Sequence, residues 1–147
     1  MKNRFTPPDM ILVIILLEFL MHHFLPIKQI ISYPYNLLGI ILLVVGMIPN
    51  FWVYFQFKGV TPRDIYEMPK KLITSGLFKI SRNPVYLGMA LILTGLAILL
   101  GSLISFIFPI IFIILTDKFI FPTEEKNLEK TFGKKYKEYK KRVRRWI

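Results

Sequence analysis

The 147-residue chain contains no cysteine, and this absence excludes several kinds of chemistry. Disulfides, thiolate zinc sites and a cysteine nucleophile are all ruled out, while the redox compartment stays open. Phosphate-binding loops are also missing, because the eight glycines never fall in a GxGxxG or GxxxxGK pattern. His22 and His23 are adjacent and therefore point to different faces of a helix, so no metal site is predicted.

Acidic residues are scarce in this sequence. Nine Asp and Glu stand against 20 Lys and Arg, which gives a net charge of +11, while 54% of the residues are hydrophobic and the mean hydropathy is +0.50. A bilayer excludes charge from its core, and anionic leaflets attract basic residues at its edge. The composition therefore predicts an integral membrane protein with cationic flanks, formed by one domain over residues 1–147.

Four apolar runs are candidates for membrane-spanning helices, at residues 10–25, 37–57, 85–100 and 103–121. The first run is not followed by a small-residue cleavage site, which favours a helix over a removed signal peptide. Only Gly101 and Ser102 separate the last two runs, so these should form a tight antiparallel hairpin. Pro49 and Pro109 lie inside the second and fourth runs, where kinks are expected. The predicted fold is all-α, with about four transmembrane helices.

The basic residues predict the orientation of these helices. Four spans place the N-terminus, the 58–84 loop and the tail at residues 122–147 on one side of the membrane. Counted with Lys118 at the end of the fourth run, that side carries every Lys and Arg except Lys28. Because basic residues are enriched in cytoplasmic segments, both termini are predicted to be cytoplasmic.

The tail is too polar to be a fifth span. Apolar positions recur in it at helical spacing, at Leu128, Phe132, Tyr136, Tyr139 and Val143, and Gly133 interrupts the pattern. This pattern predicts two short amphipathic helices lying against the cytoplasmic membrane face, with Thr123 as the N-cap of the first.

A few polar residues interrupt the apolar runs. Glu18 and His22 are four apart and could pair within the first helix. A buried hydrogen bond or an interfacial position is favoured for them over a proton relay. Asn50 could satisfy carbonyls freed by the kink at Pro49. The aromatic residues at 51–55 are interpreted as an interfacial belt.

Two segments combine residues of the kind that bind ligands. They are "TSGLFKISRNPVYLG" at 74–88 and "EEKNLEKTFGKKYKEY" at 124–139. The predicted hairpin brings both to the same membrane face, where they supply a cation, an amide, two carboxylates and aromatic rings. Such a set could hold a zwitterionic ligand with a planar ring. Alternatively, Arg82 merely pairs with a lipid phosphate or with Glu124, and spacing alone leaves both readings open.

The sequence from about Lys70 to the C-terminus resembles the isoprenylcysteine carboxyl methyltransferase family. These integral-membrane enzymes use S-adenosylmethionine and are related to phospholipid N-methyltransferases. The resemblance is carried by Arg-x-Pro-x-Tyr-x-Gly at 82–88, a helical hairpin, Glu-Glu at 124–125 and Phe-Gly-x-x-Tyr-x-x-Tyr at 132–139. The first two runs match only in hydrophobicity.

The resemblance implies a cytoplasmic S-adenosylmethionine pocket roofed by the C-terminal helices. Glu124 would receive the amino group of the cofactor, with Glu125 supporting it. The other implied cofactor contacts are Leu72, Ile73, Phe78, Arg82, Asn83, Pro84, Val85 and Tyr86. A lipophilic acceptor, either an isoprenylcysteine carboxylate or a lipid headgroup, would enter from the bilayer. Methyl transfer from a sulfonium is an in-line displacement that depends on positioning, so no catalytic base is assigned.

Three positions depart from the family pattern. Asn83 stands where the family usually has His, and Arg144 stands where it usually has Pro. Ile120 occupies the position at which animal members have an Arg that meets the substrate carboxylate, and the nearest cation is Lys118. Either another cation, such as Arg82 or Arg142, takes a carboxylate, or the natural acceptor is not a carboxylate.

Two other functions remain as alternatives. Membrane sterol reductases that use NADPH have similar C-terminal motifs but are usually much longer. A non-enzymatic membrane protein whose basic tail binds anionic lipid would also have this composition. Membrane lipids and a lipophilic acceptor are the expected partners, and nucleic acid is not.

Overall fold

The computed structural model describes residues 7–25, 27–56 and 71–147. Within this part of the chain the regular elements are helices, and the backbone bridge between Gln29 and Ser102 is isolated. The α-helices are α1 (Pro7–Phe24), α2 (Leu38–Gln56), α4 (Pro84–Leu100), α5 (Ile107–Leu115), α6 (Phe121–Phe132) and α7 (Lys134–Arg142). Shorter helical turns are Tyr35–Leu37, Gly76–Lys79, Leu103–Phe106 and the π-helical Thr116–Ile120. The predicted all-α class is confirmed.

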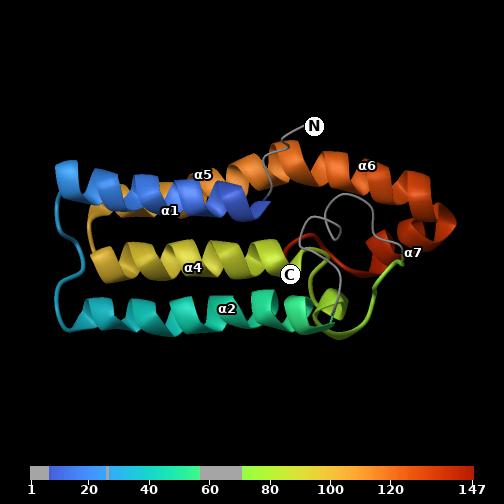
Figure 1. Cartoon of the computed structure of the whole chain (residues 1–147), viewed down its shortest axis with the longest axis horizontal. Coiled ribbons are helices and arrows are strands. Elements are labelled where there is room, and N and C mark those ends of the chain that lie inside the picture. Colours follow the sequence, from blue (N-terminus) through green and yellow to red (C-terminus); the bar gives the residue numbers. More distant parts are fainter. Residues whose placement is uncertain (1–6, 26, 57–70) are drawn as a thin grey trace.

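The helices form an elongated bundle with α4 at its centre (Figure 1). Three segments are long and apolar enough to cross a membrane, Pro7–Phe24, Tyr35–Gln56 and Leu103–Phe132, and α4 is a shorter apolar helix of 17 residues. Leu93 and Ala97 of α4 are completely buried, whereas the outer helices expose large apolar side chains such as Leu12, Ile41 and Ile110. Apolar surface of this extent marks contact with lipid, so the protein is an integral membrane protein.

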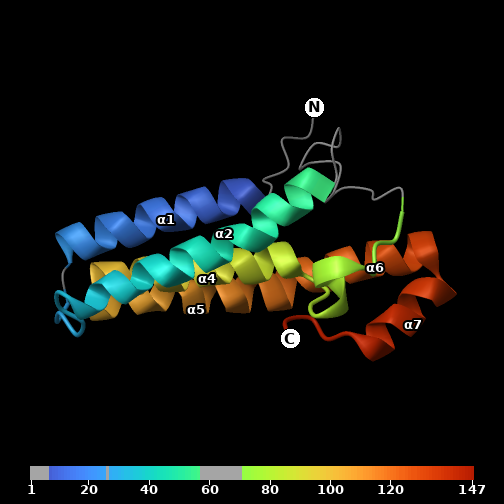
Figure 2. The same cartoon turned by 90° about the horizontal axis from the view of Figure 1, so that it is seen from below.

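The predicted hairpin between the last two apolar runs is confirmed. Helix α4 is capped by Gly101, whose φ of 71° lies in the left-handed region that favours glycine. The N–H of Gly101 donates to the carbonyl of Ala97 over 2.9 Å. The chain then reverses through Leu103–Phe106 into α5. Figures 1 and 2 show α4 and α5 side by side and antiparallel.

Helices α2 and α4 pack closely because glycines face each other. A Cβ atom on Gly88 would meet the carbonyl oxygen of Gly46 and the side chain of Asn50, so only glycine permits this approach. Asn50 Nδ2 donates to the carbonyl of Gly46 over 2.9 Å. Pro49 has no N–H, so the carbonyl of Val45 lacks its helical hydrogen-bond donor. The carbonyl that Asn50 contacts is the next one along the chain.

Pro109 lies near the start of a regular helix and not in the middle of one. The fourth apolar run begins as a 3-10 turn and becomes α-helical at Ile107, so Pro109 lies in the first turn of α5. A missing N–H is tolerated there. The irregular stretch is instead the π-helical turn Thr116–Ile120. It lies just before Pro122, whose ring would meet the carbonyl of Lys118 in a regular α-helix.

The tail contains the two predicted helices, and Gly133 separates them as expected. The prediction that Thr123 caps α6 is wrong, because the helix continues from the fourth run without a break. The hydroxyl of Thr123 instead donates to the carbonyl of Phe119 over 3.2 Å. Figures 1 and 2 show α6 extending beyond the bundle in line with α5, while α7 folds back.

Part of the charge pattern that predicted the orientation lies outside the described residues. These basic residues are Lys2, Arg4, Lys58, Arg63 and Lys70. The cytoplasmic position of both termini therefore stays a prediction.

Candidate functional site

A cavity lies at the end of the bundle from which α6 projects. It encloses about 720 Å³, including the part open to solvent. The segment before α4, the start of α4, α6 and α7 all contribute to it. The lining residues are Lys71, Leu72, Ile73, Phe78, Arg82, Asn83, Pro84, Val85, Tyr86, Glu124, Leu128, Tyr136 and Tyr139. Of the residues predicted to contact the cofactor, only Glu125 is absent from this set.

The start of α4 is held by a local network of hydrogen bonds. Pro84 is the first residue of the helix, a position where proline costs no backbone hydrogen bond. The N–H of Asn83 donates to Ser81 Oγ over 3.0 Å, and Asn83 Nδ2 donates to the carbonyl of Arg145 over 3.2 Å. The side chain of Asn83 therefore binds the C-terminal segment at the edge of the cavity.

The same C-terminal segment also contacts the residues just before Asn83. The N–H of Arg82 donates to the carbonyl of Arg144 over 2.9 Å, and Ser81 Oγ donates to the carbonyl of Arg145 over 3.0 Å. These hydrogen bonds to backbone carbonyls join two segments that are about 60 residues apart in sequence. They hold the turn that places Arg82 in the wall of the cavity.

Glu124 joins α6 to α4 across the cavity. The hydroxyl of Tyr86 donates to Glu124 Oε1 over 2.6 Å, and the Tyr86 ring packs edge-on against Phe121 with centroids 5.1 Å apart. Glu124 lies beyond the apolar part of the fourth span. Burial raises the pKa of Glu124 to about 7, although the Tyr86 hydrogen bond opposes this shift. A cationic ligand bound beside Glu124 would favour the ionised form of this carboxyl group.

Glu125 lies on another side of α6 and serves as the centre of an ion-pair cluster. Its carboxylate contacts Arg82 Nη1 at 3.1 Å, Lys140 Nζ at 2.8 Å and Arg145 Nε at 2.7 Å. Burial by itself would raise the pKa of Glu125, but the hydrogen bonds from Arg145 and Lys140 and the charge of Arg82 leave it below the usual value. This carboxylate binds the tail and does not line the cavity.

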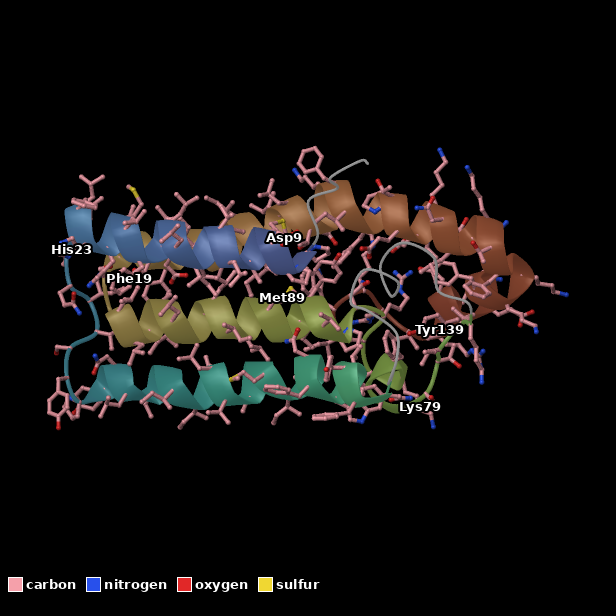
Figure 3. The ribbon with its side chains drawn as sticks, viewed as in Figure 1. Asp9, Phe19, His23, Lys79, Met89 and Tyr139 are labelled. Atoms are coloured by element: carbon pink, nitrogen blue, oxygen red, sulfur yellow. The ribbon has the colours of Figure 1, made fainter. Side chains whose placement is uncertain are left out.

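Two tyrosines of α7 cover the cavity. Tyr139 donates its hydroxyl to the carbonyl of Phe78 over 2.6 Å, and Tyr136 lies 3.5 Å from Arg82 Nη1. Figure 3 shows Tyr139 and Lys79 at the same end of the molecule. The sequence pattern identified both tyrosines as the apolar face of a tail helix. Their three-residue spacing also makes them line one wall of the cavity.

Other contributors were not identified from the sequence as part of a site. Lys71 and Leu128 line the cavity. Trp52, interpreted as part of an aromatic belt, packs against Phe78 with ring centroids 6.5 Å apart and supports the wall from α2. Only the tertiary contact between α2 and the 76–79 turn identifies this role for Trp52.

Arg82 is buried although it is charged. Its side chain is 8% exposed, and its Nε–H has no acceptor among the described residues. The cavity therefore combines a carboxyl group, a guanidinium and an amine with apolar and aromatic walls. This combination can bind a zwitterionic molecule that also has a planar apolar part.

The residues considered for an acceptor carboxylate lie elsewhere. Ile120 packs against the hydrophobic core. Lys118 is exposed and does not line the cavity, and Arg142 lines a separate cavity near the C-terminal segment.

The possible pair between Glu18 and His22 is not formed, and His22 bonds to another residue. His22 Nδ1 lies 2.8 Å from Ser102 Oγ, which the hairpin turn brings to the end of α1. Glu18 is completely buried, and its carboxylate oxygens have no hydrogen-bond partner among the described residues. In this part of the chain no group of His, Asp and Glu has an arrangement that could hold a metal ion. Figure 3 shows His23 at the opposite end of the bundle from Tyr139.

Fold and cavity together define a helical integral membrane protein with a polar and aromatic site at one end of its bundle. A family model described as phospholipid methyltransferase matches residues 35–135, and the chain belongs to this family. The matched region runs from Tyr35 into the start of α7 and contains the residues that line the cavity except Tyr136 and Tyr139. The family assigns the protein to the membrane methyltransferases.

Two further comparisons add little to this assignment. An uncharacterised protein of Haemophilus influenzae (strain ATCC 51907 / DSM 11121 / KW20 / Rd) is 40% identical over 63 residues, which is 43% of this chain and all of the relative. No solved structure shows a significant match.

Proposed function

We propose that the cavity between α4, α6 and α7 binds S-adenosylmethionine and that the protein transfers its methyl group to a lipophilic acceptor in the membrane. One observation carries this proposal. Residues from 71–86 and from 124–139, which are far apart in sequence, line one cavity that contains both a carboxyl group and basic side chains. Membership of the phospholipid methyltransferase family supports it.

The cavity residues suit the three chemical parts of this cofactor. Glu124 accepts hydrogen bonds from the ammonium group, and Arg82 and Lys71 bring positive charge for the carboxylate. Leu72, Ile73 and the rings of α7 offer apolar surface to the adenosyl group. When bound, the cofactor supplies a methyl group on a positively charged sulfur. The role of the chain is to hold the acceptor in line with that methyl and to exclude water.

We infer that an amine headgroup fits this protein better than a prenylcysteine carboxylate. Ile120 packs against the hydrophobic core, and neither Lys118 nor Arg142 lines the cavity. The two cations among the described lining residues, Arg82 and Lys71, are assigned to the carboxylate of the cofactor, which leaves none for a carboxylate on the acceptor. A neutral amine needs no such cation. Its lone pair forms the new N–C bond while the C–S bond breaks, and the amine proton leaves to water.

Two assays on the full chain in detergent test the proposal. Isothermal titration with S-adenosylmethionine and, separately, with NADPH distinguishes a methyltransferase from a reductase. Binding of neither would favour a non-enzymatic lipid-binding protein. A methylation assay then compares an amine-headgroup lipid with a farnesylcysteine analogue. Fast, saturable methyl-ester formation on the farnesylcysteine analogue would contradict the inference drawn from Ile120.

A further inference from the structure

A second cavity lies between the π-helical turn, the end of α7 and the C-terminal segment. It encloses about 820 Å³, part of it open to solvent. Six of its lining residues are basic and one is acidic, Asp117. The basic residues are Arg82, Lys140, Lys141, Arg142, Arg144 and Arg145.

The acidic groups nearby neutralise only part of this charge. Glu125 is paired with Arg82, Lys140 and Arg145, and Asp117 Oδ1 lies 3.2 Å from Arg145 Nη1. Among the described residues, Lys141, Arg142 and Arg144 have no ion pair. The cavity therefore keeps an excess of positive charge, which suits an anion.

Arg82, which also lines the first cavity, adds a second observation. It contributes to the wall of this cavity, it is almost completely buried, and its Nε–H has no acceptor in the part of the chain that the structure describes. Buried donors in folded proteins are almost always satisfied, so such a group calls for a partner. Arginine presents its donors in a planar fork that matches phosphate oxygens.

The position of the cavity favours a lipid as the source of the phosphate. Asp117 lies at the end of the fourth apolar run, and Trp146 packs against Phe121 with ring centroids 5.2 Å apart. Phe119 and Ile147 nearby are 67% and 71% exposed. Figures 1 and 2 place the C-terminal segment beside the ends of α4 and α5, and not at the far tip of α6. Basic and aromatic residues at this level face the headgroup region of a bilayer.

We propose that this cavity binds the phosphate of an anionic phospholipid from the leaflet at this end of the bundle. The site is separate from the cavity assigned to the cofactor, although Arg82 contributes to the walls of both. It does not depend on whether the protein binds S-adenosylmethionine. A zwitterionic lipid also carries a phosphate, but its cationic group is repelled by the basic lining.

Native mass spectrometry of the full chain in detergent tests this site, with phosphatidylglycerol, phosphatidylcholine and inorganic phosphate as separate probes. The double variant Lys141→Gln/Arg144→Gln removes two charges from the cavity. The matched control Lys134→Gln/Lys135→Gln removes two exposed charges at the start of α7, outside the cavity. Circular dichroism checks that both variants are folded.

The wild-type protein should retain one phosphatidylglycerol in preference to phosphatidylcholine. The cavity variant should bind it about tenfold more weakly, and the control should change by less than about threefold. Equal losses in both variants would mean diffuse attraction to the basic tail and would overturn the proposal. Inorganic phosphate that binds as tightly as the lipid, with the same dependence on Lys141 and Arg144, would overturn the lipid assignment.

Discussion

At the residue scale, Glu124 and Glu125 are neighbours with different surroundings. Successive residues of an α-helix point about 100° apart, so the two carboxyl groups leave α6 on different sides. Glu124 contacts Tyr86 in the cavity, whereas Glu125 contacts Arg82, Lys140 and Arg145. The proposed ligand-binding role therefore belongs to Glu124, and the role of Glu125 is to hold the tail in place.

Glu124→Gln should weaken S-adenosylmethionine binding by about 10- to 150-fold. A charge-assisted hydrogen bond contributes about 1.5–3 kcal/mol, and each tenfold change in affinity corresponds to about 1.4 kcal/mol. Isothermal titration measures the change. Glu138→Gln, an exposed position on α7 outside the cavity, is the control and should bind normally. An unchanged affinity in folded Glu124→Gln would place the ammonium site elsewhere.

Binding should also depend on pH through the same carboxyl group. The pKa of Glu124 is raised to about 7, so the group is mostly protonated below this pH and ionised above it. Because the ammonium group prefers the ionised form, affinity should rise about tenfold between about pH 6 and about pH 8. Titration at several pH values measures this rise, and Glu124→Gln should abolish it. A flat profile in the wild-type protein would show that Glu124 is not the group that senses pH.

Glu125→Gln should reduce stability, because it removes the partner of a buried guanidinium. The Arg82 side chain is 8% exposed, and breaking one side of a buried pair costs about 3 kcal/mol or more. Thermal unfolding followed by tryptophan fluorescence should show a clear fall in Tm. Glu129→Gln is the control, since Glu129 pairs with Lys140 nearer the surface and should cost about 1 kcal/mol or less. Equal effects of the two variants would contradict the central role given to Glu125.

At the scale of the elements, the contact between α2 and α4 positions the wall of the cavity. Close approach of the glycines brings Trp52 of α2 against Phe78, and Phe78 lines the cavity. Gly46→Val would put a side chain against the carbonyl of Gly88 and push the helices apart. Such overpacking costs about 1–3 kcal/mol.

Thermal unfolding in detergent should therefore show a lower Tm for Gly46→Val. Val44→Leu is the matched control, because Val44 is 57% exposed on the same helix and its enlarged side chain would face outward. A Tm equal to that of the wild-type protein would mean that α2 and α4 can separate without cost. It would also show that this contact does not fix the Trp52 side of the cavity.

At the scale of the whole molecule, the asymmetric distribution of basic residues predicts the orientation in the membrane. Ser75→Cys and Lys137→Cys lie at the end that carries the cavity, and each should be labelled only from the cytoplasm. Ser32→Cys, between α1 and α2 at the opposite end, should be labelled from outside. The chain has no cysteine of its own, so each introduced thiol reports only its own position. Labelling of Ser75→Cys or Lys137→Cys from outside would reverse the topology.

Much of the fold could be predicted from local patterns. The run at 85–100 corresponds to α4 at Pro84–Leu100, and the pair Gly101–Ser102 was sufficient to predict the hairpin. That hairpin explains why the segments at 74–88 and 124–139 lie together. The end of the fourth span was harder to predict, because Pro122 and Thr123 look like helix-start residues yet lie inside a continuous helix.

The sequence by itself determined the class of the protein, because burying apolar runs in lipid depends only on their length and composition. It also determined which two segments meet. The family resemblance named most of the lining residues, and the tertiary structure decided that Glu124, and not Glu125, faces the cavity. Helical phase sets that choice, and the π-helical turn Thr116–Ile120 changes the phase of α6 relative to α5. Long-range contacts decided the rest, since neither the bond from His22 to Ser102 nor the three cations around Glu125 can be identified from spacing along the chain.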